Sequence, residues 1–244
     1  MIIEAFNLVY FMLLILIAVS VVVISIIFKN KDEKTKDIFI YSIGAFNIIL
    51  FIVYKIFLSQ DGYDFNIWKE LPLQLCNINM FIIPLAVLLK NKYLLSFGFY
   101  VAPLAALMAM TFPEHAFTGN SIFLMRNIGF YGTHGIIIVM GILLITFGYI
   151  KTSFKDVIYL IPITLVLGLF AFIVNLVLFA VTKVETNYFF TMNTSDISIL
   201  NLFYNLIPVK FLYLLPAMLI LVAYVCAFNG IKKLSIKLKE ICCN

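Results

Sequence analysis

The sequence predicts an all-α, polytopic integral membrane protein with about seven transmembrane helices. Of its 244 residues, 64% are hydrophobic and 12% are charged, whereas roughly 25% of residues are charged in a typical soluble protein. The mean hydropathy is +1.11. A soluble core cannot bury so much apolar surface in a chain of this length, and the same composition excludes disorder. The lipid bilayer is therefore the expected solvent.

The apolar stretches give the expected spans. A bilayer core about 30 Å thick needs about 20 apolar residues in a helix. Such stretches occur at 5–28, 37–58, 72–89, 94–112, 128–150, 157–182 and 208–230. The first is interpreted as a span and not as a secretion signal, because no basic segment precedes it and no small-residue cleavage site follows it. The third and fourth are short and contain Pro84 and Pro103, which a membrane helix tolerates when its neighbours satisfy the freed carbonyls.

Lysine distribution predicts the orientation. Twelve lysines lie in the connections after the first, third, fifth and seventh spans: Lys29, Lys31, Lys34, Lys36, Lys90, Lys92, Lys151, Lys155, Lys232, Lys233, Lys237 and Lys239. The other connections hold four basic residues: Lys69, Arg126, Lys183 and Lys210. By the positive-inside rule the N-terminus is outside and the C-terminus is cytoplasmic. Lys55, near the end of the second span, is expected to extend to the outer surface.

No linker, low-complexity tract or internal repeat divides the chain, so a single domain over 1–244 is expected, in the cell (plasma) membrane. The longest non-apolar stretch, 183–206, is expected to be a folded lid or a re-entrant segment. The abundance of Phe, Ile, Asn and Lys suggests an AT-rich bacterial genome. The net charge of +5 is explained by topology and does not indicate a nucleic-acid partner.

Polar side chains inside the spans mark the candidate site, because they are costly in lipid. With this topology they gather in the outer half of the membrane: Gln74, Cys76, Asn77 and Asn79 at the start of the third span, Asn127 and His134 in the fifth, and Asn175, Asn187 and Tyr188 at or after the end of the sixth. Cys76, Asn79 and Met80 share one helix face. Glycines beside His134 allow another helix backbone to approach closely.

A thiol and an imidazole at one depth suggest a nucleophile and its base. The thiolate is the reactive form, and a neighbouring His134 could take the proton from Cys76. Asn187 or Asn175 could orient the imidazole or donate to an oxyanion. The alternatives are that Cys76 is an apolar filler, as Cys226 is expected to be, and that the asparagines only join helices. Cysteine spacing predicts neither a metal site nor a disulfide framework, and no cofactor motif is present.

Three short motifs resemble one family. The run Leu71–Asn77 (LPLQLCN) resembles the "LPLHLC" segment of the YwaF-like bacterial membrane proteins and of eukaryotic transmembrane protein 164. Thr133-His134-Gly135 is similar to that family's "HG" helix, and Thr186-Asn187-Tyr188 to its "TNY" segment, in the same order and spacing. Two departures are Gln74, where the family often has His, and the stretch 206–210, which lacks a Trp-rich pattern.

The resemblance implies an integral membrane acyltransferase that moves a fatty acyl chain between a phospholipid and a lysophospholipid. It implies that Cys76 carries the acyl group as a thioester and that His134 assists. Asn187, Tyr188, Asn77, Asn79 and Asn175 are supporting candidates. Water as acceptor would give a lipase instead. A rival from another class is a transporter or solute-binding membrane protein, with helices broken at Pro84, Pro103 and Pro162.

Overall fold

The computed structural model describes residues 1–4, 6–60, 65–111 and 119–242. Six long helices are α1 (Leu8–Phe28), α2 (Glu33–Gln60), α4 (Lys92–Thr111), α5 (Met125–Thr146), α6 (Val157–Thr182) and α8 (Leu215–Cys242). Two shorter ones are α3 (Leu75–Leu88) and α7 (Ser198–Leu206). Each of the seven expected spans contains a helix, and six helices in the described part of the chain are long and apolar enough to cross a membrane.

The third expected span differs from its prediction. Helix α3 has 14 residues, and at about 1.5 Å per residue it is roughly 21 Å long, less than a hydrocarbon core of about 30 Å. The residues that precede it are not helical: Pro72 disfavours helix at Leu71, and Gln74 is extended. The expected count of seven full spans therefore becomes six long helices and one short apolar helix.

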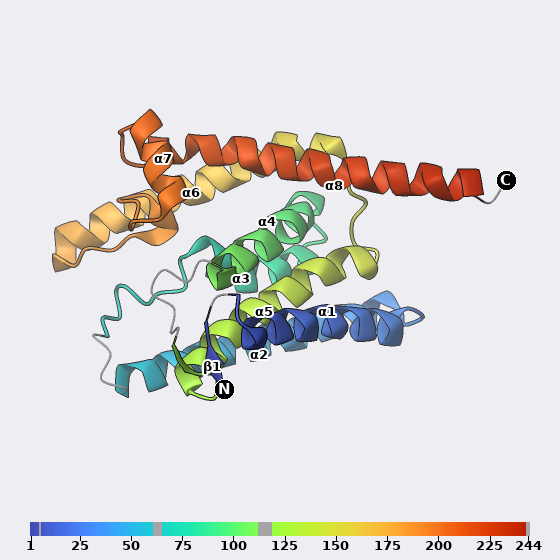
Figure 1. Ribbon diagram of the computed structural model, residues 1–244, viewed down its shortest axis with the longest axis horizontal. Coiled ribbons are helices and arrows are strands. Elements are labelled where there is room, and N and C mark those ends of the chain that lie inside the picture. The colour runs from blue at the N-terminus through green and yellow to red at the C-terminus, as the bar shows by residue number, and fades with distance from the viewer. Residues whose placement is uncertain (5, 61–64, 112–118, 243–244) are drawn as a thin grey trace.

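The structure also contains a small two-stranded sheet, which was not predicted from the sequence. Strand β1 (Ile2–Ile3) pairs antiparallel with β2 (Asn120–Ser121). The pairing joins the segment before α1 to the connection between α4 and α5, so the N-terminus lies at the end of the molecule where α5 begins (Figure 1). The Asn127 amide donates to the Ser121 carbonyl at 2.7 Å and fastens this connection to the first turn of α5.

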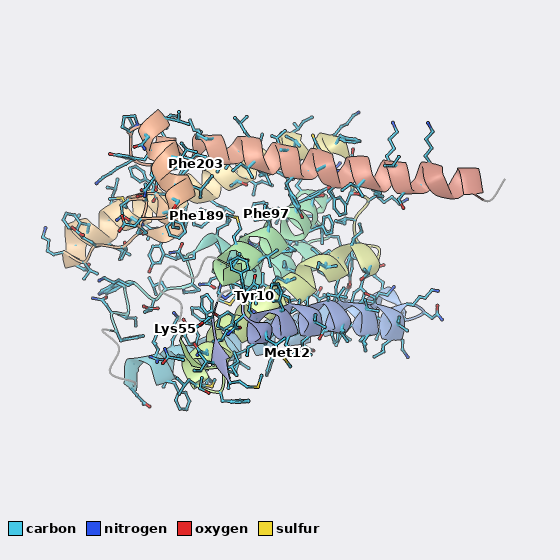
Figure 2. The ribbon with its side chains drawn as sticks, in the orientation of Figure 1. Tyr10, Met12, Lys55, Phe97, Phe189 and Phe203 are labelled. Carbon is cyan, nitrogen blue, oxygen red and sulfur yellow. The ribbon has the colours of Figure 1, made fainter. Side chains whose placement is uncertain are left out.

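Helix α5 is the centre of the first five helices and packs against α1, α2, α3 and α4. Figure 1 shows α6 and α8 side by side along one face of this group, and α6 contacts α4. Most of the buried apolar side chains belong to the α1–α5 group, while Phe189 and Phe203 lie with α6–α8 (Figure 2). The half-exposed Met12 of α1 and the buried Tyr10 illustrate how one face of α1 is left for lipid.

Glycine and proline allow the central helices to touch. A Cβ atom added to Gly129 of α5 would lie 2.1 Å from Cβ of Tyr54 in α2, so only glycine fits there. A Cβ on Gly141 would lie 2.7 Å from Cγ of Pro103, and one on Gly44 would lie 2.6 Å from Cγ of Pro84. The prolines of α3 and α4 thus pack into glycine positions of α2 and α5. Helices α3 and α4 continue through these prolines, as α6 continues through Pro162.

The segment between α6 and α8 is folded, as expected. It contains the 3₁₀ turn η2 (Tyr188–Phe190), α7 and the 3₁₀ turn η3 (Leu212–Leu214); a further turn, η1 (Phe154–Asp156), precedes α6. Phe189 and Phe190 have φ of 55° and 54°, which non-glycine residues adopt only when the surroundings fix them. Two of the hydrogen bonds that fix this segment come from Gln74, which lies two residues before Cys76 in the chain.

Candidate functional site

His134 is in the first half of α5 and only 3% of it is exposed. Its Nδ1 lies 2.7 Å from the carbonyl oxygen of Phe130, one turn earlier in the helix. A carbonyl only accepts, so Nδ1 carries the proton and Nε2 keeps its lone pair. Nε2 is buried and has no hydrogen-bond partner among the described residues. The helix therefore presents an imidazole with a fixed tautomer and an unoccupied acceptor.

Cys76 is the second residue of α3 and is half-buried. The first N–H groups of a helix have no partner within it and favour a negative charge nearby. Cys76 and Asn77 are the second and third residues of α3, so their N–H groups are among those without a partner inside the helix. A thiolate, or an oxyanion formed on a group bound to this sulfur, would meet these donors.

Buried amides lie beside both residues. Asn79 donates to the carbonyl of Leu75 at 2.6 Å, and Asn47 of α2 donates to the carbonyl of Thr133 at 3.4 Å. Both side chains are fully buried, and the Oδ1 atom of each lacks a partner in the part of the chain that the structure describes. Asn47 Oδ1, Asn79 Oδ1 and His134 Nε2 are thus three buried acceptors, one each from α2, α3 and α5, that the described residues leave unpaired.

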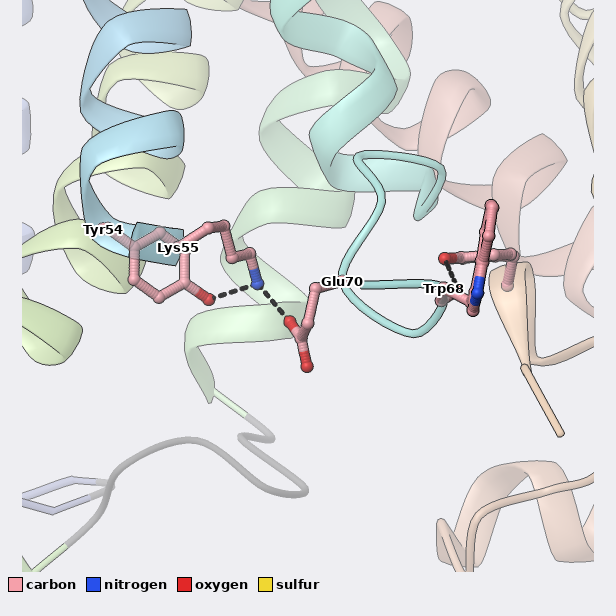
Figure 3. Close-up of polar contacts among 5 residues, drawn as sticks. Tyr54, Lys55, Trp68 and Glu70 are labelled. Atoms are coloured by element: carbon pink, nitrogen blue, oxygen red, sulfur yellow. Dashed lines mark hydrogen bonds and ion pairs between the residues drawn. The ribbon is translucent and has the colours of Figure 1, made fainter. Parts of the chain in front are cut away.

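A charged pair joins α2 to the segment before α3. Lys55 forms an ion pair with Glu70 and donates to the Tyr54 hydroxyl at 2.7 Å (Figure 3). The side chains of Lys55 and Glu70 are only 16% and 13% exposed. The Lys55 side chain thus reaches the connection before α3, where Glu70 provides its counter-charge.

Lys55→Met should destabilise the protein by about 3 kcal/mol, because it leaves Glu70 charged, shielded and unpaired. Lys55→Met/Glu70→Leu should recover part of this loss. Thermal unfolding in detergent measures both. The control is Glu33→Gln, which breaks the exposed Lys90–Glu33 pair and should cost less than ~1 kcal/mol. Equal losses in Lys55→Met and Glu33→Gln would contradict a structural role for the inner pair.

Gln74 connects α3 to the segment after α6. Its Oε1 accepts from the Phe189 N–H at 2.9 Å, and its Nε2 donates to the Asn187 carbonyl at 3.4 Å. A primary amide can donate and accept side by side along an extended backbone. Gln74 immediately precedes α3, so these two bonds fix the position of the first turn that carries Cys76.

Asn175 organises the same segment from α6. Its Oδ1 accepts from the Thr186 hydroxyl at 2.7 Å and the Tyr188 N–H at 3.1 Å, while its Nδ2 donates to Thr191 Oγ1 at 2.9 Å and the Tyr188 carbonyl at 3.1 Å. The amide is fully buried, and both its oxygen and its nitrogen make two hydrogen bonds each. It stabilises the fold of the segment that Gln74 holds.

The other two supporting candidates of this segment have structural partners. Burial raises the pKa of Tyr188 to about 12, so its phenol stays protonated and donates to the Trp68 carbonyl. The Asn187 amide is bonded within its own segment, to Asn193, Ser195 and Met192. In the described residues no side-chain hydrogen bond joins Asn175 or Asn187 to Cys76 or His134.

The sequence matches the TMEM164 family over residues 4–228. The chain belongs to the TMEM164 family. The TMEM164 match covers Cys76, His134 and the segment after α6, and confirms the resemblance seen in the short motifs. Neither the curated proteins nor the solved structures give a match.

The sequence did not identify two residues of this site, Asn47 and Glu70, and it did not predict that Gln74 connects α3 to the segment after α6. A signal existed for Glu70, since Lys55 within an apolar stretch needs a counter-charge and Glu70 is the next acidic residue after the second span that the structure describes. No signal pointed to the Gln74 contacts, whose partners are 113 and 115 residues away. Within the described residues no group of three or more His, Cys, Asp or Glu side chains could hold a metal ion.

Proposed function

We propose that this multi-pass TMEM164-family protein is a membrane acyltransferase that moves a fatty acyl chain from a phospholipid to a lysophospholipid through a thioester on Cys76. The observation that carries the proposal is the His134 imidazole, whose Nδ1–H is held by a carbonyl and whose buried Nε2 is unoccupied. A buried general base needs this arrangement, because its free nitrogen must accept a proton in a fixed direction.

In the first half-reaction, His134 Nε2 takes the Cys76 thiol proton and the sulfur attacks the ester carbonyl of the phospholipid. The N–H groups of Cys76 and Asn77 stabilise the oxyanion. The ester C–O bond then breaks, His134 returns the proton to the leaving oxygen, and a lysophospholipid departs. The products are a neutral imidazole and an acyl thioester.

In the second half-reaction, the hydroxyl of another lysophospholipid gives its proton to His134 Nε2 and attacks the thioester carbonyl. The C–S bond breaks, and the thiolate regains the proton from the imidazolium. Water in the same place would make the protein a lipase, and the presence or absence of acylated acceptor separates these outcomes.

The Lys55–Glu70 ion pair fixes the segment before α3 to α2 and so helps to position Cys76. Asn175, Asn187 and Tyr188 act indirectly, by fixing the segment that holds Gln74. The reaction needs neither metal nor nucleotide.

A transporter remains the second candidate. It would use the same polar layer as a solute site, but transporters of this kind typically use discontinuous helices. The continuity of α3, α4 and α6 through their prolines favours the acyltransferase.

The lysine asymmetry supports an orientation with the N-terminus outside and the C-terminus in the cytoplasm of a bacterial cell, in its plasma membrane. Cys76 and His134 would then face the outer leaflet. A reporter enzyme fused to the C-terminus should be active only if it is of a type that works in the cytoplasm. Activity of a periplasmic reporter at that position would reverse the proposed leaflet.

Intact-mass analysis of the protein purified with its lipids tests the chemistry. We expect a mass increment of fatty-acyl size on Cys76 that hydroxylamine removes, because hydroxylamine cleaves thioesters. A protein that never carries this increment, even when incubated with phospholipid, would favour the transporter.

A further inference from the structure

A cavity of about 330 Å³ lies at the other end of the helices that carry the candidate site. Its walls come from the start of α2, the turn between α3 and α4, and the residues after α5. Cys76 is in the first turn of α3, whereas Lys90 follows the end of that helix. The length of α3 therefore separates the cavity from Cys76 by roughly 20 Å.

The cavity has a positive charge. Lys36, Lys90 and Lys92 line it, and Glu33 is its one acidic lining residue among the described ones. Glu33 is already paired with Lys90, at 2.6 Å. The lining residues alone therefore carry a net charge of +2, which is that of Lys36 and Lys92. The nearby Asp37 is not part of the lining; it keeps its negative charge and accepts a hydrogen bond from the Tyr149 hydroxyl at 2.5 Å.

These two lysines have weak partners. The Lys36 ammonium donates to the Phe147 carbonyl at 3.5 Å and lies 5.8 Å from the centre of the Phe147 ring. The Lys92 ammonium lies 5.0 Å from the centre of the Tyr93 ring. Neither contacts a carboxylate within the described residues. An anion in the cavity would meet two ammonium groups without having to displace a salt bridge.

The surroundings of the cavity suit a lipid. Ile38, Leu88 and Leu89, which follow or precede the lining lysines in the chain, are all more than half exposed. These side chains lie at the ends of helices that are apolar enough to be in a membrane. Apolar side chains beside an ammonium-lined cavity match the acyl chains and the charged headgroup of one phospholipid.

We propose that this cavity binds the headgroup of an anionic phospholipid in the leaflet at the lysine-rich end of the helices. The phosphate lies between Lys36 and Lys92, and the acyl chains follow the exposed apolar residues at the ends of α2 and α3. The site is independent of the acyl-transfer chemistry, which is at the opposite end of α3.

Native mass spectrometry of the full-length protein in detergent tests this binding. Phosphatidylglycerol is titrated against phosphatidylcholine with the same acyl chains, and inorganic phosphate is the headgroup-free competitor. We expect wild type to prefer phosphatidylglycerol, and Lys36→Gln/Lys92→Gln to bind it roughly tenfold more weakly, since each lysine near an anionic lipid contributes substantially. Lys36→Arg/Lys92→Arg should bind like wild type.

The matched control is Lys29→Gln/Lys31→Gln, which removes the same charge from the connection that leads into α2 but not from the cavity lining. It should retain wild-type affinity. Equal weakening in both double variants would overturn the site in favour of general attraction to the basic end. Displacement of the lipid by millimolar inorganic phosphate would overturn the lipid as occupant. If Lys36→Gln/Lys92→Gln does not fold, Lys92→Gln alone must still weaken binding severalfold.

Discussion

Replacing Cys76 with alanine should abolish both the hydroxylamine-sensitive adduct and acyl transfer. The sulfur is the atom that carries the acyl group in the proposed reaction, and Cys226, the other cysteine whose side chain the structure describes, belongs to α8 and is exposed. The loss should therefore be complete within detection, well beyond the 10²–10⁴-fold effects typical of a missing general base. Transfer of a labelled acyl chain between phospholipid and lysophospholipid, in reconstituted vesicles, measures it.

Cys226→Ala is the matched control and should keep both the adduct and the turnover. Cys76→Ser gives a finer test, because a serine could form only an ester, which resists hydroxylamine far better than a thioester. Comparable transfer by wild type and by folded Cys76→Ala would refute the mechanism, and the transporter would become the leading candidate.

Replacing His134 with alanine should slow the formation of the acyl-enzyme by about 10²–10⁴-fold at neutral pH. The Cys76 thiol then has no acceptor for its proton, although it remains intrinsically nucleophilic once ionised. Raising the pH should restore part of the rate in His134→Ala, because hydroxide removes the proton that the imidazole took in wild type. The rate of adduct formation, followed by mass between neutral and alkaline pH, gives both results.

The two residues should also act as one unit. In the Cys76→Ala/His134→Ala variant the defect in turnover should equal that of Cys76→Ala alone, because residues of a catalytic unit are strongly non-additive. A His134→Ala variant whose adduct forms at the wild-type rate across the pH range would remove the imidazole from the mechanism and leave it a packing role against Phe130.

The sequence by itself determined the solvent, the helical class and the approximate position of the long helices. Hydropathy is a property of each segment alone, since transfer of an apolar stretch into lipid does not depend on its neighbours. The sequence also placed Cys76 and His134 as the candidate pair, because a polar residue inside an apolar stretch is visible without knowledge of its partners. The TMEM164 family was visible in three short motifs.

Only the tertiary structure decided the details on which chemistry depends. It shortened the third span to Leu75–Leu88 and paired Ile2–Ile3 with Asn120–Ser121. It paired Lys55 with Glu70, and it joined the Gln74 amide by hydrogen bonds to a backbone segment more than a hundred residues away. It also assigned the His134 tautomer, through the Phe130 carbonyl. Each of these depends on which surfaces meet when helices pack, and long-range contacts of this kind leave no periodic signal in a single chain.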